Sequence, residues 1–446
     1  MNTFGRLGSE FLTEWDEALY ATSATEMIDR GDWVDVTFWG ARDYYNSKPP
    51  LNVWLIAGSF AVFGQTIFAL RLPSAAAALL TVVVIIFWGR RHLGARTALV
   101  AGAILATSYG FLYVHSGRTA NTDALFTLFI TLIVMALVES KAVANRLVWC
   151  GPLLAAIFLL RGMALLMPAV IILAVALIRR DVVTRARYYA AMIALAVIPI
   201  VFWAAARWQV DGPLFFAALI RNDLIGVTTE VLDNHAGGWF FYLRVLLKYQ
   251  YDWVAAGLMS FALLRRYQPL SPHLRSVLLP WGLVAIAIPT AMATKTTWYL
   301  NPFYPFAAIV LAVVIAPACE WPSTGPRRSQ VAALAVVIVS LITAESRLVW
   351  RSVRHRDISR SVQGAVLAHA DAIEHRRVFK TQWDHADRFV VEKMAGGVTV
   401  VSDTLADAIA SSASGDFVVW HDEIEHPELE LVGHSRHQFL YRRTGR

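Results

Sequence analysis

The residues best suited to chemistry are a few acids that lie near long apolar segments. Asp16 and Glu17 are adjacent near the start of the chain, and Asp123 follows Arg118 by five residues. Tyr20 lies four residues after Asp16, so the two side chains share a face if this stretch is helical. A carboxylate beside a phenol could act as a general base on an acceptor hydroxyl. Each acid could equally cap a helix or complement its dipole.

Four cations lie near the apolar segments without an obvious structural reason. They are Lys48, Arg118, Arg161 and Lys295. Charged groups at membrane level are costly and are usually functional or paired. Four cations that converge would suit an anionic lipid head, such as a polyprenyl phosphate. The alternative is that each side chain reaches ordinary lipid headgroups by itself.

The composition places the chain among membrane proteins. Of its 446 residues, 57% are hydrophobic and 16% are charged, whereas a soluble chain is about half apolar and a quarter charged. Long apolar runs recur along the chain and are continuous rather than alternating, which favours a polytopic α-helical protein over a barrel. The net charge of +7 arises mostly from short loops, so it indicates membrane topology rather than nucleic-acid binding. Two cysteines cannot form a disulfide framework.

The apolar runs predict about ten membrane spans. Their expected ranges are 71–88, 97–115, 122–138, 147–160, 163–178, 188–206, 241–264, 276–293, 299–318 and 329–347. The fourth and fifth runs are separated only by a short Arg-Gly-Met turn, but together they are too long for one crossing.

Loop charge predicts the orientation of these spans. Alternate loops hold fourteen basic residues, within 89–96, 139–146, 179–187, 265–275 and 325–330. The intervening short loops hold only Arg118, Arg161 and Lys295. Because cytoplasmic loops are enriched in Lys and Arg, we expect the basic set to be cytoplasmic. The start of the chain, the loop 207–240 and the tail would then be extracytoplasmic.

We expect three parts along the chain: an extracytoplasmic first loop (1–70), a transmembrane domain (71–347) and a small extracytoplasmic α/β domain (348–446). In the first loop, 14–29 should be a helix with Gly31 as its C-cap, and 51–64 is too short to span and should lie in the membrane interface. In the tail, helices are expected at 360–375 and 384–395, and strands at 397–403, 416–422, 429–434 and 437–443. Eight of the twelve histidines lie in the tail, and their spacing favours surface positions over a metal site.

A series of segments resembles one enzyme superfamily. The segments are WDEALYATSATEMIDRGDWV, YYNSKPPLNVWLIAGSFAVFG, ALRLPSAAAALLTVVVIIFWGRRHLG, SGRTANTDALFTLFI, LLRGMALLMPAVIIL, DNHAGGWFFYLRVLL and TKTTWYLNPFYPFAAIVLA. In this order they resemble the GT-C glycosyltransferases of the protein O-mannosyltransferase and lipid A aminoarabinose transferase superfamily. The resemblance covers about residues 10–320 and fixes neither the sugar nor the acceptor.

The resemblance implies an enzyme that takes a sugar from a polyprenyl-phosphate carrier at the extracytoplasmic face. It implies that Asp16 is the base on the acceptor, that Glu17 is its neighbour in an Asp-Glu pair, and that Asp123 is the acid of the second outer loop. Residues matched to the donor phosphate are Lys48, Arg118, Arg161, Lys295 and Tyr299. Tyr20 and His235 would line the same pocket. The acceptor would be a lipid, a glycan or a protein, and inversion at the anomeric carbon is the stereochemistry implied.

The chain departs from the family pattern at three places. A span is expected before the Asp-Glu pair, but residues 1–13 contain no apolar run. Either the natural start lies upstream, or this chain lacks that helix. The lipid A branch has Glu before Lys-Pro-Pro and Arg before the first-helix tyrosine, where this chain has Ser47 and Leu19. Both changes argue against aminoarabinose transfer to lipid A, and the loss of Glu weakens the case for a divalent metal, although His235 remains.

Two other functions are compatible with the sequence. A transporter or lipid-linked sugar flippase would also be polytopic, but transporters usually show internal repeats and charges at the membrane midplane. This chain shows no repeat, and its charges gather at span ends. A catalytically inactive scaffold is the third hypothesis, prompted by the missing first span.

Overall fold

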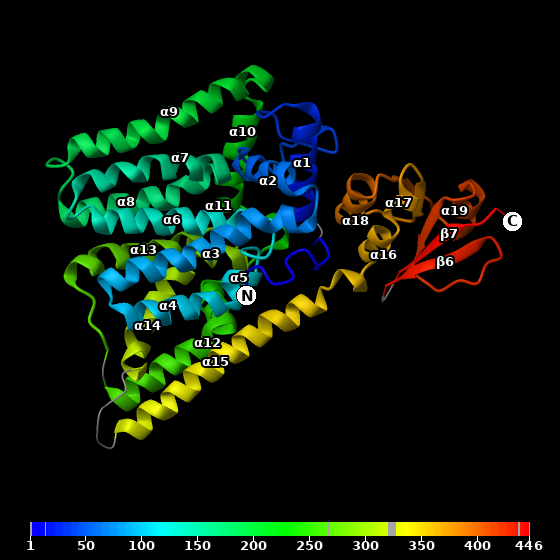
Figure 1. The fold of residues 1–446 in the computed structure, drawn as a ribbon. Helices are drawn as coiled ribbons and strands as arrows, with labels where there is room; N and C mark the ends of the chain where they lie inside the picture. The colour runs from blue at the N-terminus through cyan, green and yellow to red at the C-terminus, as the bar shows by residue number, and fades with distance from the viewer. Residues whose placement is uncertain (1, 14, 266, 320–326, 436–437, 446) are drawn as a thin grey trace. The chain divides into compact units, whose positions relative to one another are not determined.

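Long helices dominate the chain, and a small sheet lies near its C-terminus (Figure 1). The computed structural model describes residues 2–13, 15–265, 267–319, 327–435 and 438–445. Their contacts define two compact units. Unit 1 comprises 1–3, 42–52 and 74–349, and unit 2 comprises 4–41, 53–73 and 350–446. The expected boundaries after residues 70 and 347 stay predictions.

The helices of the apolar part follow the predicted spans. They are α3 (Ile67–His92), α4 (Ala95–Thr107), α5 (Tyr109–Tyr113), α6 (Asp123–Glu139), η1 (Ala144–Trp149), α7 (Cys150–Arg161), η2 (Gly162–Leu165), α8 (Leu166–Arg179), α9 (Ala186–Asp211), α12 (Phe241–Leu264), α13 (Pro272–Ala291), η5 (Thr297–Phe303), α14 (Tyr304–Ile315), η6 (Ala316–Cys319) and α15 (Arg327–His355). Each of the ten predicted ranges falls on one or more of these helices. Within unit 1, α7 packs against α6 and α9, and α4 packs against α14.

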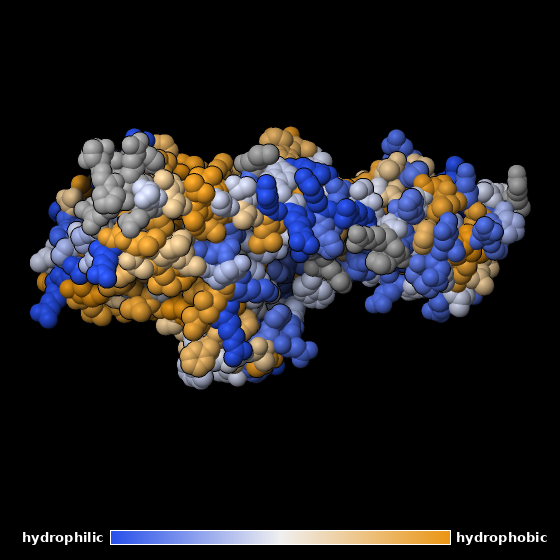
Figure 2. Space-filling view, turned by 90° about the horizontal axis from the view of Figure 1, so that it is seen from below, coloured by the Kyte–Doolittle hydropathy of each residue, from blue (hydrophilic) through white to orange (hydrophobic). Residues whose placement is uncertain are grey.

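Six helical segments in the described part of the chain are long and apolar enough to cross a membrane. They are 67–92, 144–179, 186–211, 272–291, 297–315 and 331–355. The prediction of a polytopic helical membrane protein is therefore confirmed, whereas the number ten stays a prediction. Apolar side chains cover much of the surface of these helices in Figure 2, as expected where lipid replaces water.

Shorter elements connect and precede the long helices. They are α1 (Asp16–Arg30), β1 (Thr37–Phe38), β2 (Ala41–Arg42), α2 (Leu51–Phe63), α10 (Leu214–Ile220), η3 (Arg221–Gly226), α11 (Val227–Thr229) and η4 (Leu232–Asn234). The helix predicted at 14–29 is present as α1, which begins at Asp16, and residue 14 lies outside the described residues. Its expected C-cap is also confirmed, because Gly31 has φ 66° and donates its N–H to the carbonyl of Ile28. The interfacial location of α2 stays a prediction.

The C-terminal part of unit 2 is a small α/β domain. Its elements are η7 (Ile358–Arg360), α16 (Val362–Ala368), α17 (Ala370–Ile373), β3 (Arg377–Lys380), α18 (His385–Phe389), η8 (Val390–Met394), β4 (Val398–Val401), α19 (Leu405–Ser411), β5 (Phe417–Trp420), β6 (Leu429–His434) and β7 (Phe439–Arg443). The strand order is β4-β3-β5-β7-β6. β3 pairs in parallel with β4 and β5, whereas β7 is antiparallel to β5 and β6.

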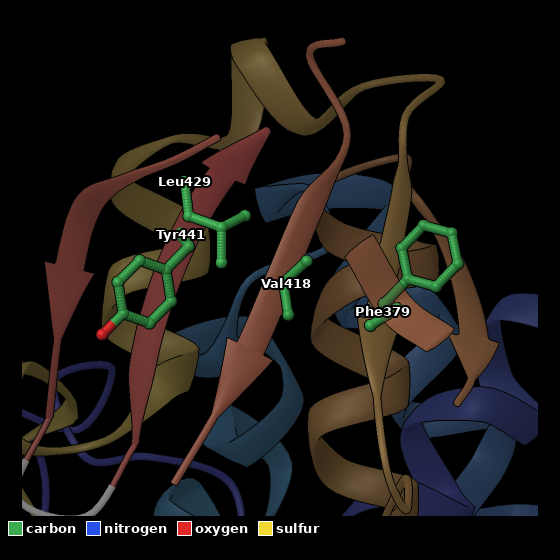
Figure 3. Close-up of a cluster of buried hydrophobic side chains, with 5 residues drawn as sticks. Phe379, Val418, Leu429 and Tyr441 are labelled. Atoms are coloured by element: carbon green, nitrogen blue, oxygen red, sulfur yellow. The ribbon is translucent and has the colours of Figure 1, made fainter. Parts of the chain in front are cut away.

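The four predicted strands are present, and the sequence missed β3. This strand lies between β4 and β5, is only four residues long and carries charges at both ends, so it shows no alternating pattern. Phe379 of β3 nevertheless lies in the domain core with Val418, Leu429 and Tyr441 (Figure 3). The start of the last predicted strand, at residue 437, lies outside the described residues.

Candidate functional site

The centre of the candidate site in unit 1 is an ion pair between two helix ends. Arg161 ends α7, and its Nη1 lies 2.5 Å from Oδ1 of Asp123, the first residue of α6. The guanidinium carbon lies 5.3 Å from the ring centroid of Tyr299 and 5.5 Å from that of Phe126. The Asp123 and Arg161 side chains are only 4% and 14% exposed. The structure thus brings together three predicted site residues, and the flanking rings restrict where Arg161 can point.

A glycine turn allows another loop to approach this ion pair. Gly162 follows the last residue of α7 and has φ 51°. A Cβ atom at this position would lie 2.5 Å from Cδ1 of Leu219 and 3.2 Å from Oδ2 of Asp223. Glycine is therefore needed both for the positive φ and for the close packing. The predicted Arg-Gly turn brings the loop 207–240 next to Arg161.

Asp223 is a candidate site residue that the sequence reasoning missed. It lies in η3, a π-helical turn, and such turns are frequent at functional sites. Burial raises the pKa of this carboxyl to about 6, although the positive charges of Lys48 and Arg161 act in the opposite direction. Its Oδ2 is buried and has no hydrogen-bond partner among the described residues. The available signal was a single acid in the largely apolar run LFFAALIRNDLIG.

The Lys48 loop is fixed to the loop 207–240 at three points. Tyr44 donates to Asp211 Oδ2 at 3.0 Å, Tyr45 donates to the Asp233 carboxylate at 2.7 Å, and Asn222 Nδ2 donates to the Tyr44 carbonyl at 2.8 Å. Lys48 itself donates to the side chain of Asn46. The bond from Asn222 brings the Lys48 loop beside η3, and the positive charge of Lys48 acts to lower the pKa of Asp223 there.

Lys295 and His235 are joined through the backbone. The Lys295 N–H donates to the carbonyl of His235 at 2.9 Å, and the largely buried Lys295 Nζ donates to the carbonyl of Met292. The His235 ring makes an edge contact with Trp298, which stacks on His115 at 3.8 Å. These contacts hold the late segment before α14 against the loop 207–240.

Arg118 is buried in unit 1 and contacts the start of the chain. It is 1% exposed, and its Nη1 donates to the carbonyls of Asn2 at 2.7 Å and Thr3 at 3.1 Å. These bonds fix the chain start. The role of Arg118 at a donor phosphate stays a prediction.

The acids of α1 belong to unit 2 and have different surroundings. Glu17 is fully buried, and its two carboxylate oxygens each accept a hydrogen bond of 2.7 Å from Arg71. Burial alone would raise the pKa of Glu17, but the charge and hydrogen bonds of Arg71, with those of Thr13, lower it below the ordinary value. Asp16 is half-buried and Tyr20 is buried one turn later. The roles of all three residues stay predictions.

The residues do not favour a metal centre. Among the described residues, no three His, Cys, Asp or Glu side chains are grouped so that they could hold a metal ion. Ser47 offers a neutral hydroxyl where a carboxylate ligand would be needed. The His235 ring packs against Trp298.

Comparison with known proteins agrees with this architecture. The family model described as dolichyl-phosphate-mannose-protein mannosyltransferase matches residues 47–203, a stretch that contains Lys48, Arg118, Asp123 and Arg161. The crystal structure of ArnT from Cupriavidus metallidurans bound to undecaprenyl phosphate is similar with a TM-score of 0.68 and 15% identity, over 99% of this chain and 95% of that chain. The crystal structure of the apo oligosaccharyltransferase of Archaeoglobus fulgidus is similar with a TM-score of 0.52 and 12% identity, over 90% of this chain and 62% of that chain.

The sequence relatives carry consistent names. An undecaprenyl phosphate-alpha-4-amino-4-deoxy-L-arabinose arabinosyl transferase 2 of Pseudomonas fluorescens is 28% identical over 308 residues, which cover 67% of this chain and 52% of the relative. The corresponding transferase of Pseudomonas savastanoi pv. phaseolicola is 30% identical over 238 residues, which cover 52% of this chain and 44% of the relative. The chain thus spans about half the length of these relatives.

Fold and matches together define a polytopic membrane protein of GT-C type. The family model, the sequence relatives and the solved structure all make the chain similar to the superfamily that includes the protein O-mannosyltransferases and the aminoarabinose transferases. The resemblance seen in the sequence is thereby confirmed.

Proposed function

We propose that this chain is an integral-membrane glycosyltransferase that moves a sugar from a polyprenyl-phosphate carrier to an acceptor hydroxyl or phosphate. The observation that carries the proposal is the buried cluster of Arg161, Asp123 and Tyr299, together with the Lys48 loop that is hydrogen-bonded to the neighbouring loop 207–240. A fixed guanidinium and an ammonium are suited to a phosphate. The names of the relatives, which are transferases using undecaprenyl phosphate sugars, support the same chemistry.

In this mechanism the cations act on the leaving group. Arg161 and Lys48 bind the donor phosphate, and Asp123 positions Arg161 through their ion pair. Lys295, Tyr299 and Arg118 complete the donor side. As the bond between the anomeric carbon and the phosphate oxygen breaks, the cations stabilise the charge that develops on the departing polyprenyl phosphate.

Asp16 acts on the acceptor. It removes the proton of the acceptor hydroxyl while the acceptor oxygen forms its bond to the anomeric carbon, with inversion. The electron pair of the broken bond leaves with the phosphate. Glu17 supports the base from the adjacent position.

We place the reaction at the extracytoplasmic face of the cell membrane. The support is the alternation of basic loops along the chain, since Lys and Arg are enriched in cytoplasmic loops. The C-terminal domain then also lies outside the cytoplasm. The acceptor is a lipid, a glycan or a protein. Ser47 and Leu19 argue against lipid A as the acceptor of aminoarabinose.

The test uses membranes with a panel of labelled polyprenyl-phosphate sugars. We compare wild type with Asp16→Asn and Arg161→Ala. Loss of the base should lower transfer by about 10²–10⁴-fold, and loss of the cation by about 10²–10³-fold. Matched controls are Asp29→Asn, at the exposed end of the same helix, and Arg187→Ala, an exposed arginine at the start of α9.

Equal transfer by all five proteins would refute the assignment of these residues. Absence of product with wild type and every donor, together with sugar-dependent flux in proteoliposomes, would show a flippase instead.

A further inference from the structure

The segment that leads into Asp16 is bound by the C-terminal domain within unit 2. The N–H of Phe11 donates to the carbonyl of Arg356 at 2.9 Å, and the N–H of Ile358 donates to the carbonyl of Ser9 at 2.8 Å. These bonds flank an isolated antiparallel bridge between Glu10 and Asp357. The segment therefore pairs, like a short edge strand, with the chain that enters the C-terminal domain.

The side-chain amide of Gln363 in α16 binds both the N–H and the carbonyl of Leu12, the residue that follows Phe11. Its Oε1 accepts from the N–H of Leu12 at 2.8 Å, and its Nε2 donates to the Leu12 carbonyl at 3.2 Å. The amide is 4% exposed, and its Nε2 also lies 3.1 Å from Oδ1 of Asp387. Asp387 in turn accepts from Lys380 Nζ at 2.5 Å. A buried network of this kind orients the amide, so that its two Leu12 bonds are made in one geometry.

The residue directly before Asp16 touches the same domain. The Trp15 ring makes an edge contact with the His385 ring at 5.3 Å, and Trp39 Nε1 donates to His385 Nδ1 at 3.1 Å. Trp15 has φ 73°. A bulky residue in this region is strained by about 1–3 kcal/mol and persists only where its surroundings hold it. The His385 contact is one such restraint.

Arg71 also binds this segment. Besides binding Glu17, Arg71 donates to the carbonyls of Leu7, Glu10 and Phe11, at 3.2, 3.1 and 2.9 Å. The segment that precedes Asp16 is thus bonded both to Arg71 and to the C-terminal domain. The bonds to the backbone of residues 9–12 and the contact that restrains Trp15 together determine the direction in which α1 begins.

We propose that the C-terminal domain positions the acceptor-activating carboxylate of Asp16, with Gln363 and His385 as positioning residues. This inference rests on the proposed function, since it concerns the base of that reaction. The C-terminal domain would then affect kcat, through the position of Asp16, rather than binding of the donor. Displacement of a reacting group by about 1 Å can cost about 10²-fold in rate.

The test compares full-length wild type with Gln363→Met, which keeps the side-chain size and removes the three hydrogen bonds. His385→Ala is the second variant, because this half-buried side chain can be removed with little effect on the domain core. The matched control is Arg377→Met, which removes an ion pair with Asp416 inside the same domain, separate from the bonds that Gln363 and His385 make. The measurements are amide hydrogen exchange over residues 9–17, and kcat and KM for the donor.

Gln363→Met and His385→Ala should exchange faster over residues 9–17 and lose about 10–10²-fold in kcat, with KM for the donor changed less than about threefold. Arg377→Met should resemble wild type in both measurements. Unchanged kcat in Gln363→Met with faster exchange would overturn the positioning role, as would an equal loss of kcat in Arg377→Met. If wild type transfers no sugar, the proposed function fails. Unchanged hydrogen exchange over residues 9–17 in Gln363→Met would separately refute the conclusion that Gln363 holds this segment.

Discussion

Replacing Glu17 by glutamine tests whether this acid stabilises the fold rather than reacting. Arg71 and Glu17 are 1% and 0% exposed, and two hydrogen bonds of 2.7 Å join them. The Glu17→Gln side chain would keep the shape and one acceptor oxygen but lose the charge. Its amide group would then face either the guanidinium or the N–H of Thr13, both of which are donors.

The expected loss follows from the burial of the pair. Removing one partner of a buried ion pair costs about 3–5 kcal/mol, because the other charge remains buried without compensation. At about 2–4 °C per kcal/mol for a body of 150–250 residues, this corresponds to about 6–20 °C in Tm. The pKa of Glu17 is lowered from its ordinary 4.5. The pair therefore stabilises fully above pH 4.5, and its contribution is lost as the pH falls through the folded-state pKa.

The assay is thermal unfolding of the detergent-solubilised protein between about pH 3 and 8, a range that spans the titration of the carboxyl groups, with transfer activity measured on the same samples. Glu17→Gln should melt lower at neutral pH and lose less stability than wild type on acidification. Glu425→Gln, at an exposed acid of unit 2, is the control and should melt like wild type. A Glu17→Gln protein that melts within about 1 °C of wild type, far less than the loss of a buried ion pair predicts, but has lost its activity would refute the structural role and favour a catalytic one.

Three further outcomes are expected. Gly162→Ala should destabilise by about 2–4 kcal/mol, because its Cβ would meet Leu219 at 2.5 Å. Gly212→Ala has a similar φ of 60° but no neighbour within 4 Å, so it should cost only the backbone strain of about 1–3 kcal/mol and less than Gly162→Ala in the same melting assay. Burial raises the pKa of Asp223 to about 6 from 3.8, so wild type should lose stability as the pH rises across that interval, and Asp223→Asn should flatten this slope in a pH series of Tm values. Arg161→Lys keeps the charge but not the planar fork, and it should lower transfer at least about tenfold in the labelled-donor assay.

The sequence predicted the helices well because their signal is local. Apolar runs long enough for a membrane and the Gly31 cap need no knowledge of distant residues. It also singled out Arg161 and Asp123 as candidate site residues, and Tyr299 through the family resemblance, and the structure brings these three side chains together. The short strand β3 was missed because its pairing with β4 and β5 decides its structure. Pairing of this kind leaves no periodic pattern in so short a strand.

Asp223 and Arg71 were missed for a related reason. Both are single charged residues within apolar surroundings, and their meaning depends on a partner far along the chain. Arg71 lies 54 residues from Glu17. Asp223 gains its environment only because the turn at Gly162 brings η3 close. Sequence alone flags such charges as costly but does not reveal what compensates them.

The contacts of Glu17 sharpen the choice between the two adjacent acids of α1. Successive residues on a helix point in directions about 100° apart, so only one of a neighbouring pair can face a given partner. Here Glu17 faces Arg71, and its charge is already neutralised there by two hydrogen bonds. A carboxylate held in this way, with a lowered pKa, is a poor proton acceptor. Asp16 remains half-buried on another face. If the first loop supplies the base, physical chemistry therefore favours Asp16, and Glu17 serves it by fixing the start of the helix.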